Sequence, residues 1–116
     1  MNTDFTAKLL DVHPDTRVIY LCDGILRASY RNGDSTTTNI EPGRIYEFRI
    51  DLGATSNVFK KDHRIRVEIS SSNFPRFDRN LNTGGNFATD TTWVKARQTV
   101  YPSREYSSSI VLPVIE

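Results

Sequence analysis

Two runs of alternating apolar and charged residues constrain the fold of this chain more than any other feature. The run RIYEFRIDL (44–52) places aromatic and aliphatic side chains at positions 46, 48, 50 and 52 and charged side chains at 47, 49 and 51. The run RIRVEISS (64–71) reverses this, with apolar residues at 65, 67 and 69 and charged residues between them. Successive side chains of a strand point to opposite faces of a sheet, so both runs predict half-buried strands. We expect the two to lie side by side with their outward charges paired across the ladder.

Weaker alternation predicts strands over most of the remaining chain: FTAKL (5–9), RVIYLC (17–22), ILRASYR (25–31), WVKARQTVY (93–101) and SSIVLPVI (108–115). Dipeptides that favour turns separate the segments: Pro14-Asp15, Asp23-Gly24, Asn32-Gly33 and Pro42-Gly43. Pro113 predicts an edge position or a bulge for the last segment. About seven short strands at this spacing predict an all-β fold, a single antiparallel β-sandwich or jelly roll over residues 1–116.

Composition excludes several classes of function. A chain of 116 residues is long enough for one domain with its own core. Fifteen basic and fourteen acidic residues leave a net charge of +1, so nothing would draw the chain to nucleic acid or to an anionic membrane. The chain has a single cysteine and no apolar run of membrane-spanning length, and we expect a soluble, cytoplasmic protein.

The residues offer little for catalysis. No G-x-S-x-G nucleophile motif occurs, and the two histidines, His13 and His63, stand in a proline turn and just before a predicted strand. Either could serve as a catalytic base, but we expect solvated turn histidines. Cys22 lies in an apolar strand context, which favours a buried, inert thiol over a nucleophile.

A weak calcium candidate follows the second of the two runs. It comprises three oxygen-bearing side chains at alternate positions: Asp78, Asn80 and Asn82. In the helix-loop-helix calcium motif, glycine stands sixth and glutamate twelfth, where this chain has Thr83 and Thr89. We therefore expect a stack of turns whose side chains bond their own backbone, with no bound metal and no cofactor.

The loop at residues 73–79 is the strongest candidate for binding. It consists of Asn73, Phe74, Pro75, Arg76, Phe77, Asp78 and Arg79. In one interpretation Phe74 and Phe77 cap an end of the sandwich while Asp78 pairs with Arg76 or Arg79. In the other, the loop is a docking surface, because aromatic and arginine side chains supply most binding hot spots.

Three long segments of the chain resemble a known family. They are DFTAKLLDVHPDTRVIYLCDGILRASYR (4–31), PGRIYEFRIDLGATSNVFKKDHRIRVEISSSNFPRFDRNLNTG (42–84) and QTVYPSREYSSSIVLPVI (98–115). Their order and spacing are similar to the C-terminal domain of the X-Pro dipeptidyl-peptidase and cocaine esterase class of serine hydrolases. The chain departs from the family at two turns, where Thr16 and Asp62 stand in place of the usual glycines. Asp62 can adopt a left-handed conformation at low cost, whereas β-branched Thr16 predicts a changed turn type.

The resemblance implies a jelly roll, similar to galactose-binding domains, that packs on an α/β-hydrolase domain carrying the catalytic serine, aspartate and histidine. None of that triad maps onto this chain, so we expect no activity from the chain alone. The family domain is longer, and we expect an incomplete copy that lacks the first strands. Missing strands leave open sheet edges, which predicts a homodimer or a strand-exchanged assembly for the isolated chain.

Two functions remain open. The first is a non-catalytic domain that docks on the catalytic domain of an acyl or peptidyl serine hydrolase through the 73–79 loop and helps shape the substrate cleft. The second, by analogy with the fold, is a free-standing carbohydrate-binding module that uses Trp93 as its sugar platform. A half-buried strand position is the structural alternative for Trp93.

Overall fold

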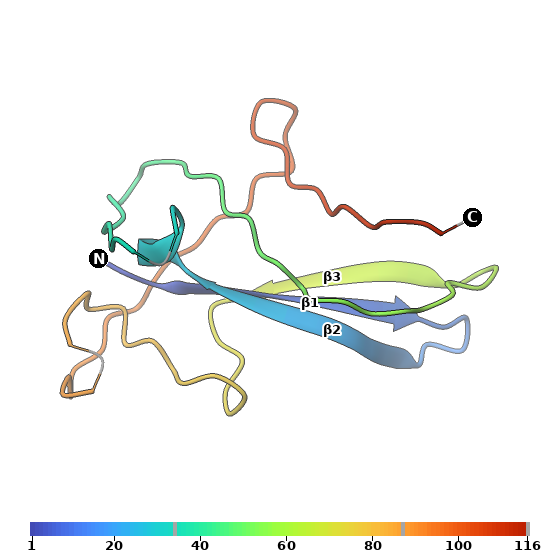
Figure 1. Cartoon of the computed structure of the whole chain (residues 1–116), viewed down its shortest axis with the longest axis horizontal. Coiled ribbons are helices and arrows are strands. Elements are labelled where there is room, and N and C mark those ends of the chain that lie inside the picture. The colour runs from blue at the N-terminus through green and yellow to red at the C-terminus, as the bar shows by residue number, and fades with distance from the viewer. Residues whose placement is uncertain (34, 87, 116) are drawn as a thin grey trace.

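The computed structural model describes residues 1–33, 35–86 and 88–115, and its regular structure is one antiparallel sheet of three strands in the order β2-β1-β3 (Figure 1). The strands are β1 (Asp4–Val12), β2 (Val18–Arg27) and β3 (Arg64–Ser70), and a short 3-10 turn, η1 (Ala28–Tyr30), follows β2. The described residues contain no α-helix, and no helix among them is long and apolar enough to cross a membrane. The all-β prediction is confirmed, whereas the jelly roll is not established by these three strands.

The core of the sheet is β1, because this strand is paired along both edges. Its apolar residues Ala7, Leu9, Leu10 and Val12 are between 2% and 6% exposed. Alternate residues of β1 face opposite sides of the sheet, so burial of both sets means that both faces of this strand are covered. The ladder to β2 contains a bulge between Leu9 and Leu10.

A single long strand, β2, replaces two predicted strands and the turn expected at Asp23-Gly24. Gly24 sits within the ladder opposite Ala7. A Cβ added at Gly24 would lie 1.9 Å from the carbonyl oxygen of Asp51, so the glycine permits a close backbone approach and makes no turn. The turn prediction was wrong because a strand glycine and a turn glycine look alike in sequence.

The predicted strand at 64–71 is confirmed as β3, but its burial and its neighbour differ from the expected ones. All of its residues are exposed, so the half-buried position predicted for it was wrong. It pairs with β1, and Ile65, Val67 and Ile69 lie opposite β1 residues of the same face. The 44–52 run is an extended segment that crosses the sheet without joining a ladder (Figure 1). Its alternation is real, since the apolar residues at 46, 48, 50 and 52 are half-buried and Phe48 stacks on Phe5 with ring centroids 4.5 Å apart.

Much apolar surface remains uncovered. The predicted strands at 93–101 and 108–115 form no ladder among the described residues, and the C-terminal part of the chain runs away from the sheet (Figure 1). The accessible surface is 9120 Å², against about 6,400 Å² for a typical folded monomer of 13.2 kDa. The exposed apolar residues on β3 are Ile65, Val67 and Ile69, and those near the C-terminus include Val111, Val114 and Ile115.

Both turns in which the chain departs from the family keep a left-handed residue. Thr16 has φ +71° and Asp62 has φ +68°. The first turn is closed by a bond from the Thr16 amide to the His13 carbonyl and by another from the His13 amide to the Arg17 carbonyl. Thr16 adopts the left-handed conformation despite its branched Cβ, and the changed turn type stays a prediction.

Candidate functional site

The 73–79 loop is anchored to the sheet by one buried carboxylate. Asp23 on β2 has a side chain that is 1% exposed, and the Asn73 Nδ2 donates a hydrogen bond of 2.6 Å to its Oδ2. Arg76 Nη2 lies 3.1 Å from Asp23 Oδ1 as an ion-pair partner, outside the geometry of a hydrogen bond. The Tyr20 hydroxyl also donates to Asp23, and this hydrogen bond raises the pKa of Tyr20. Three side chains therefore converge on Asp23, two of them from the loop.

The anchor orients the aromatic residues of the loop in different directions. Phe74 is 65% exposed, whereas Phe77 is half-buried and lies under the Arg76 guanidinium, 5.5 Å from the ring centroid. The Phe74-Pro75 peptide bond is cis. Arg76 pairs with Asp23, not with Asp78 as the capping interpretation expected. The loop thus combines a partly buried base with an exposed aromatic tip.

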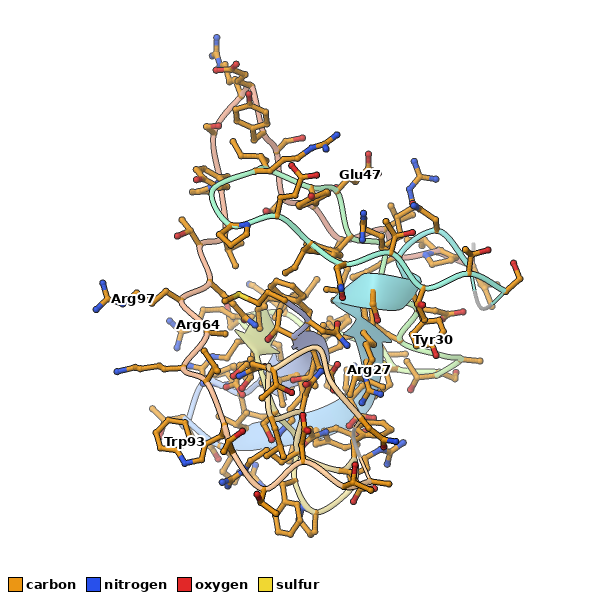
Figure 2. The ribbon with its side chains drawn as sticks, turned by 90° about the vertical axis from the view of Figure 1, so that its left-hand side faces the viewer. Arg27, Tyr30, Glu47, Arg64, Trp93 and Arg97 are labelled. Atoms are coloured by element: carbon orange, nitrogen blue, oxygen red, sulfur yellow. The ribbon has the colours of Figure 1, made fainter. Side chains whose placement is uncertain are left out.

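An open groove runs beside the loop. It is lined by Asp4, Ile25, Arg27, Tyr30, Phe77 and Asp78. The Arg27 Nε and Nη2 atoms donate to Asp4 at 2.9 and 3.2 Å, and Figure 2 shows Arg27 near Tyr30, below the 3-10 turn. The Asp4 hydrogen bond and charge raise the pKa of Arg27. The groove is therefore lined in part by a fixed ion pair, with no serine, threonine or cysteine among its lining residues.

The side chains of the calcium candidate are held in turns and contacts with the rest of the chain. Asn80 Oδ1 accepts from the Asn82 amide at 2.9 Å, while Asn80 Nδ2 donates to Asp4 Oδ1 at 2.7 Å. Asn82 Nδ2 donates to the Val94 carbonyl at 2.8 Å. Asp78 is exposed at the groove. These contacts agree with the turn interpretation, and calcium binding stays a prediction.

Trp93 lies at the periphery of the molecule (Figure 2) and is 74% exposed. It belongs to no strand, so the half-buried strand position that we considered for it was wrong. An exposed indole ring is compatible with a sugar platform, and its binding role stays a prediction.

The two histidines, which the sequence placed in separate solvated turns, lie together at one end of the sheet. Their ring centroids are 4.2 Å apart, and the side chains of His63 and His13 are 10% and 24% exposed. His63 Nδ1 lies 2.9 Å from Asp11 Oδ1. Sequence reasoning missed the cluster because Asp11 and His63 meet only through the pairing of β1 with β3.

Cys22 is half-buried on β2 and forms no disulfide. Burial and, second, the charge of Asp23 raise the pKa of this thiol. Both effects disfavour the thiolate, which agrees with an inert cysteine.

Comparison with known proteins identifies the family. Residues 1–111 match the X-Pro dipeptidyl-peptidase C-terminal non-catalytic domain. The chain belongs to this family. It is 52% identical over 118 residues to the cocaine esterase of Rhodococcus sp. (strain MB1 Bresler), an alignment that covers 100% of the chain and 21% of that enzyme. It is also 30% identical over 131 residues to putative serine esterases of Mycobacterium bovis and Mycobacterium tuberculosis, covering 97% of the chain and 19% of each. The chain thus spans about a fifth of the length of these relatives.

Proposed function

We propose that this chain packs on the α/β-hydrolase domain of a serine esterase or dipeptidyl-peptidase and helps shape the substrate cleft. The single observation that carries the proposal is the uncovered apolar surface of a chain whose family is a non-catalytic hydrolase domain. The total accessible area of the chain exceeds that of a typical monomer of this mass by about 2,700 Å². This excess is on the scale of the area that a permanent interface buries.

The exposed face of β3 supports protein contact. Ile65, Val67 and Ile69 form an apolar row at the edge of the sheet, 39% to 50% exposed. An unpaired edge with apolar side chains invites another strand or domain to cover it. We propose that the partner domain covers this edge. We also propose that the extended segments at 44–52, 93–101 and 108–115 complete a jelly-roll sandwich with the three-stranded sheet.

The 73–79 loop is the proposed contact with the cleft. Asp23 holds the base of the loop, so Phe74 can present an ordered aromatic surface at low entropic cost on binding. Neither imidazole forms a hydrogen bond with a serine among the described residues, and bond breaking is assigned to groups outside this chain.

A hybrid enzyme tests the proposal. In the Rhodococcus cocaine esterase, the matched C-terminal segment is replaced by this chain, and hydrolysis of a nitrophenyl ester is measured. Phe74→Ser in the hybrid should change kcat/KM at least about tenfold, corresponding to the loss of one aromatic hot spot. Val58→Ser is the matched control, because Val58 is 77% exposed and lies outside the loop. Equal kinetics for the two variants would remove the cleft-shaping role.

Without its partner domain, the chain should cover the same surface with a second copy of itself. We propose a homodimer or strand-exchanged oligomer for the isolated chain. Light scattering should give a mass of twice the chain or more, and a clean monomer at high concentration would count against this assembly. We also propose a cytoplasmic location, which fractionation of the source cells would test.

A carbohydrate-binding module is the alternative, and the 74% exposure of Trp93 is the observation that favours it. Trp93 is the single tryptophan of the chain, so its fluorescence reports on that position alone. A saturable change in this fluorescence on titration with sugars would support the module. Calorimetry should then detect sugar binding by the parent chain and none by Trp93→Ala. If the fluorescence of Trp93 does not change with sugar concentration, the carbohydrate-binding module is excluded and the docking function remains.

A further inference from the structure

The side chains of Asp11, His13 and His63 converge where the β1-β2 hairpin meets the start of β3. His13 follows directly after β1, and His63 directly precedes β3. One ligand atom from each of the three side chains lies within 4.8 Å of the others. Two imidazoles and a carboxylate form a ligand set typical of zinc and similar divalent transition metals.

The distances between the ligand atoms are close to those around one shared ion. Two atoms that each lie about 2.0–2.1 Å from a tetrahedral zinc ion are about 3.3–3.4 Å apart. His63 Nδ1 lies 2.9 and 3.0 Å from the two Asp11 oxygens, and His13 Nε2 lies 3.8 Å from Asp11 Oδ2. Displacements of about half an ångström of the two imidazole rings would bring these atoms to the spacing of one ion.

The charge and burial of Asp11 favour a cation at this position. Its side chain is 6% exposed, and its oxygens face imidazole nitrogens of His13 and His63. A buried carboxylate needs a compensating positive charge. A divalent ion compensates the carboxylate while both rings remain neutral, the state in which imidazole binds metals.

We propose that Asp11, His13 and His63 form a binding site for a zinc-like divalent transition metal ion. Asp11 supplies a carboxylate oxygen, His63 its Nδ1 and His13 its Nε2, and solvent beside the more exposed His13 supplies the remaining ligand. In the metal-bound state the ring hydrogen of His63 lies on Nε2, so that the Nδ1 lone pair faces the ion.

The position of the site gives the ion a structural role. The ion links the hairpin to the residue that precedes β3, across 52 residues of chain between Asp11 and His63. Among the described residues, the buried core is limited to β1 and its surroundings. A bound metal ion stabilises a domain with a small core, because it joins elements that few buried contacts hold together. This role is separate from docking on a hydrolase domain.

Cobalt and zinc titrations of the untagged chain test the site, and they are selective because His13 and His63 are its only histidines. We expect one equivalent of Co²⁺ to give a visible d–d absorption that Zn²⁺ displaces, and we expect Zn²⁺ to raise the melting temperature.

His13→Phe is the decisive variant, since it keeps an aromatic ring against His63 and removes the ligand. It should lower metal affinity more than about tenfold while the metal-free melting temperature stays close to that of the parent chain. Asp15→Asn is the matched control, because Asp15 is an exposed carboxylate of the same turn, paired with Arg17, and its loss should leave affinity unchanged. Absence of a Co²⁺ spectrum, or equal affinities for His13→Phe and the parent chain, would overturn the proposal.

Discussion

Asp4 and Arg27 stand directly opposite each other in the β1-β2 ladder and are joined by two hydrogen bonds, of 2.9 and 3.2 Å. The Asp4 side chain is 2% exposed, and it also accepts from Asn80, 76 residues further along the chain. Gln98 Nε2 donates to the Asp4 carbonyl at 3.2 Å. One carboxylate residue therefore connects the sheet to two of the segments that lack regular structure.

Arg27→Ala should lower the free energy of unfolding by about 3 kcal/mol, the low end of the range for breaking a buried pair, because Arg27 is itself partly exposed. Urea denaturation measures this. Arg49→Ala is the control: the two side chains of its pair with Glu47 are 90% and 75% exposed, so loss of this pair should change the free energy of unfolding much less. Equal losses would show that the buried position of Asp4 has no energetic consequence.

Thr16→Gly should stabilise the chain by about 1 kcal/mol, because a β-branched residue with φ +71° is strained and glycine is not. Thr36→Gly is the control, at an exposed loop position without positive φ, and it should be neutral or slightly destabilising. Thermal unfolding of both variants checks this. A lower melting temperature for Thr16→Gly than for the parent chain contradicts the strain.

The Cys22 thiol should react with Ellman's reagent more slowly than a free thiol at pH 8, because burial and the Asp23 charge raise its pKa. The neutral thiol is favoured in the folded state. Its contribution to stability is complete below the ordinary thiol pKa and is lost as pH rises through the raised value. Asp23→Asn removes one cause and should speed the reaction in mildly alkaline buffer. A rate equal to that of the unfolded chain would contradict this.

Asn73→Ala should loosen the 73–79 loop, because it removes a bond of 2.6 Å to a buried carboxylate. Loss of a hydrogen bond to a charged group costs about 1.5–3 kcal/mol. Trypsin cuts after arginine, so cleavage after Arg76 and Arg79 should accelerate, followed by mass spectrometry. Cleavage after Arg104, far along the chain, serves as the internal control and should keep its rate. Acceleration at all three sites would indicate general unfolding instead of loop release.

The sequence predicts local structure well wherever alternation and turn chemistry agree. The 64–70 strand and the inward and outward faces of 44–52 follow from a period of two. Asp62 adopts the left-handed conformation that the sequence allowed for it. These features depend on neighbours in sequence, which the pattern of residues records directly.

Features that depend on long-range pairing were not predicted. The choice of β1 as the partner of β3 brings Asp11 beside His63, and no local pattern encodes that pairing. The role of Gly24 likewise depends on the Asp51 backbone, 27 residues away. The anchoring of the 73–79 loop on Asp23 is a third case, because a strand aspartate carries no mark of its partner 50 residues later.

We propose that the chain is a scaffold that completes a hydrolase. Ester hydrolysis by three samples tests this most directly: the chain alone, the Rhodococcus cocaine esterase lacking its matched segment, and the same truncated enzyme fused to this chain. We predict no hydrolysis above buffer for the chain and little for the truncated enzyme, with activity restored in the fusion. Hydrolysis by the chain alone, or a fusion no more active than the truncated enzyme, would contradict the account.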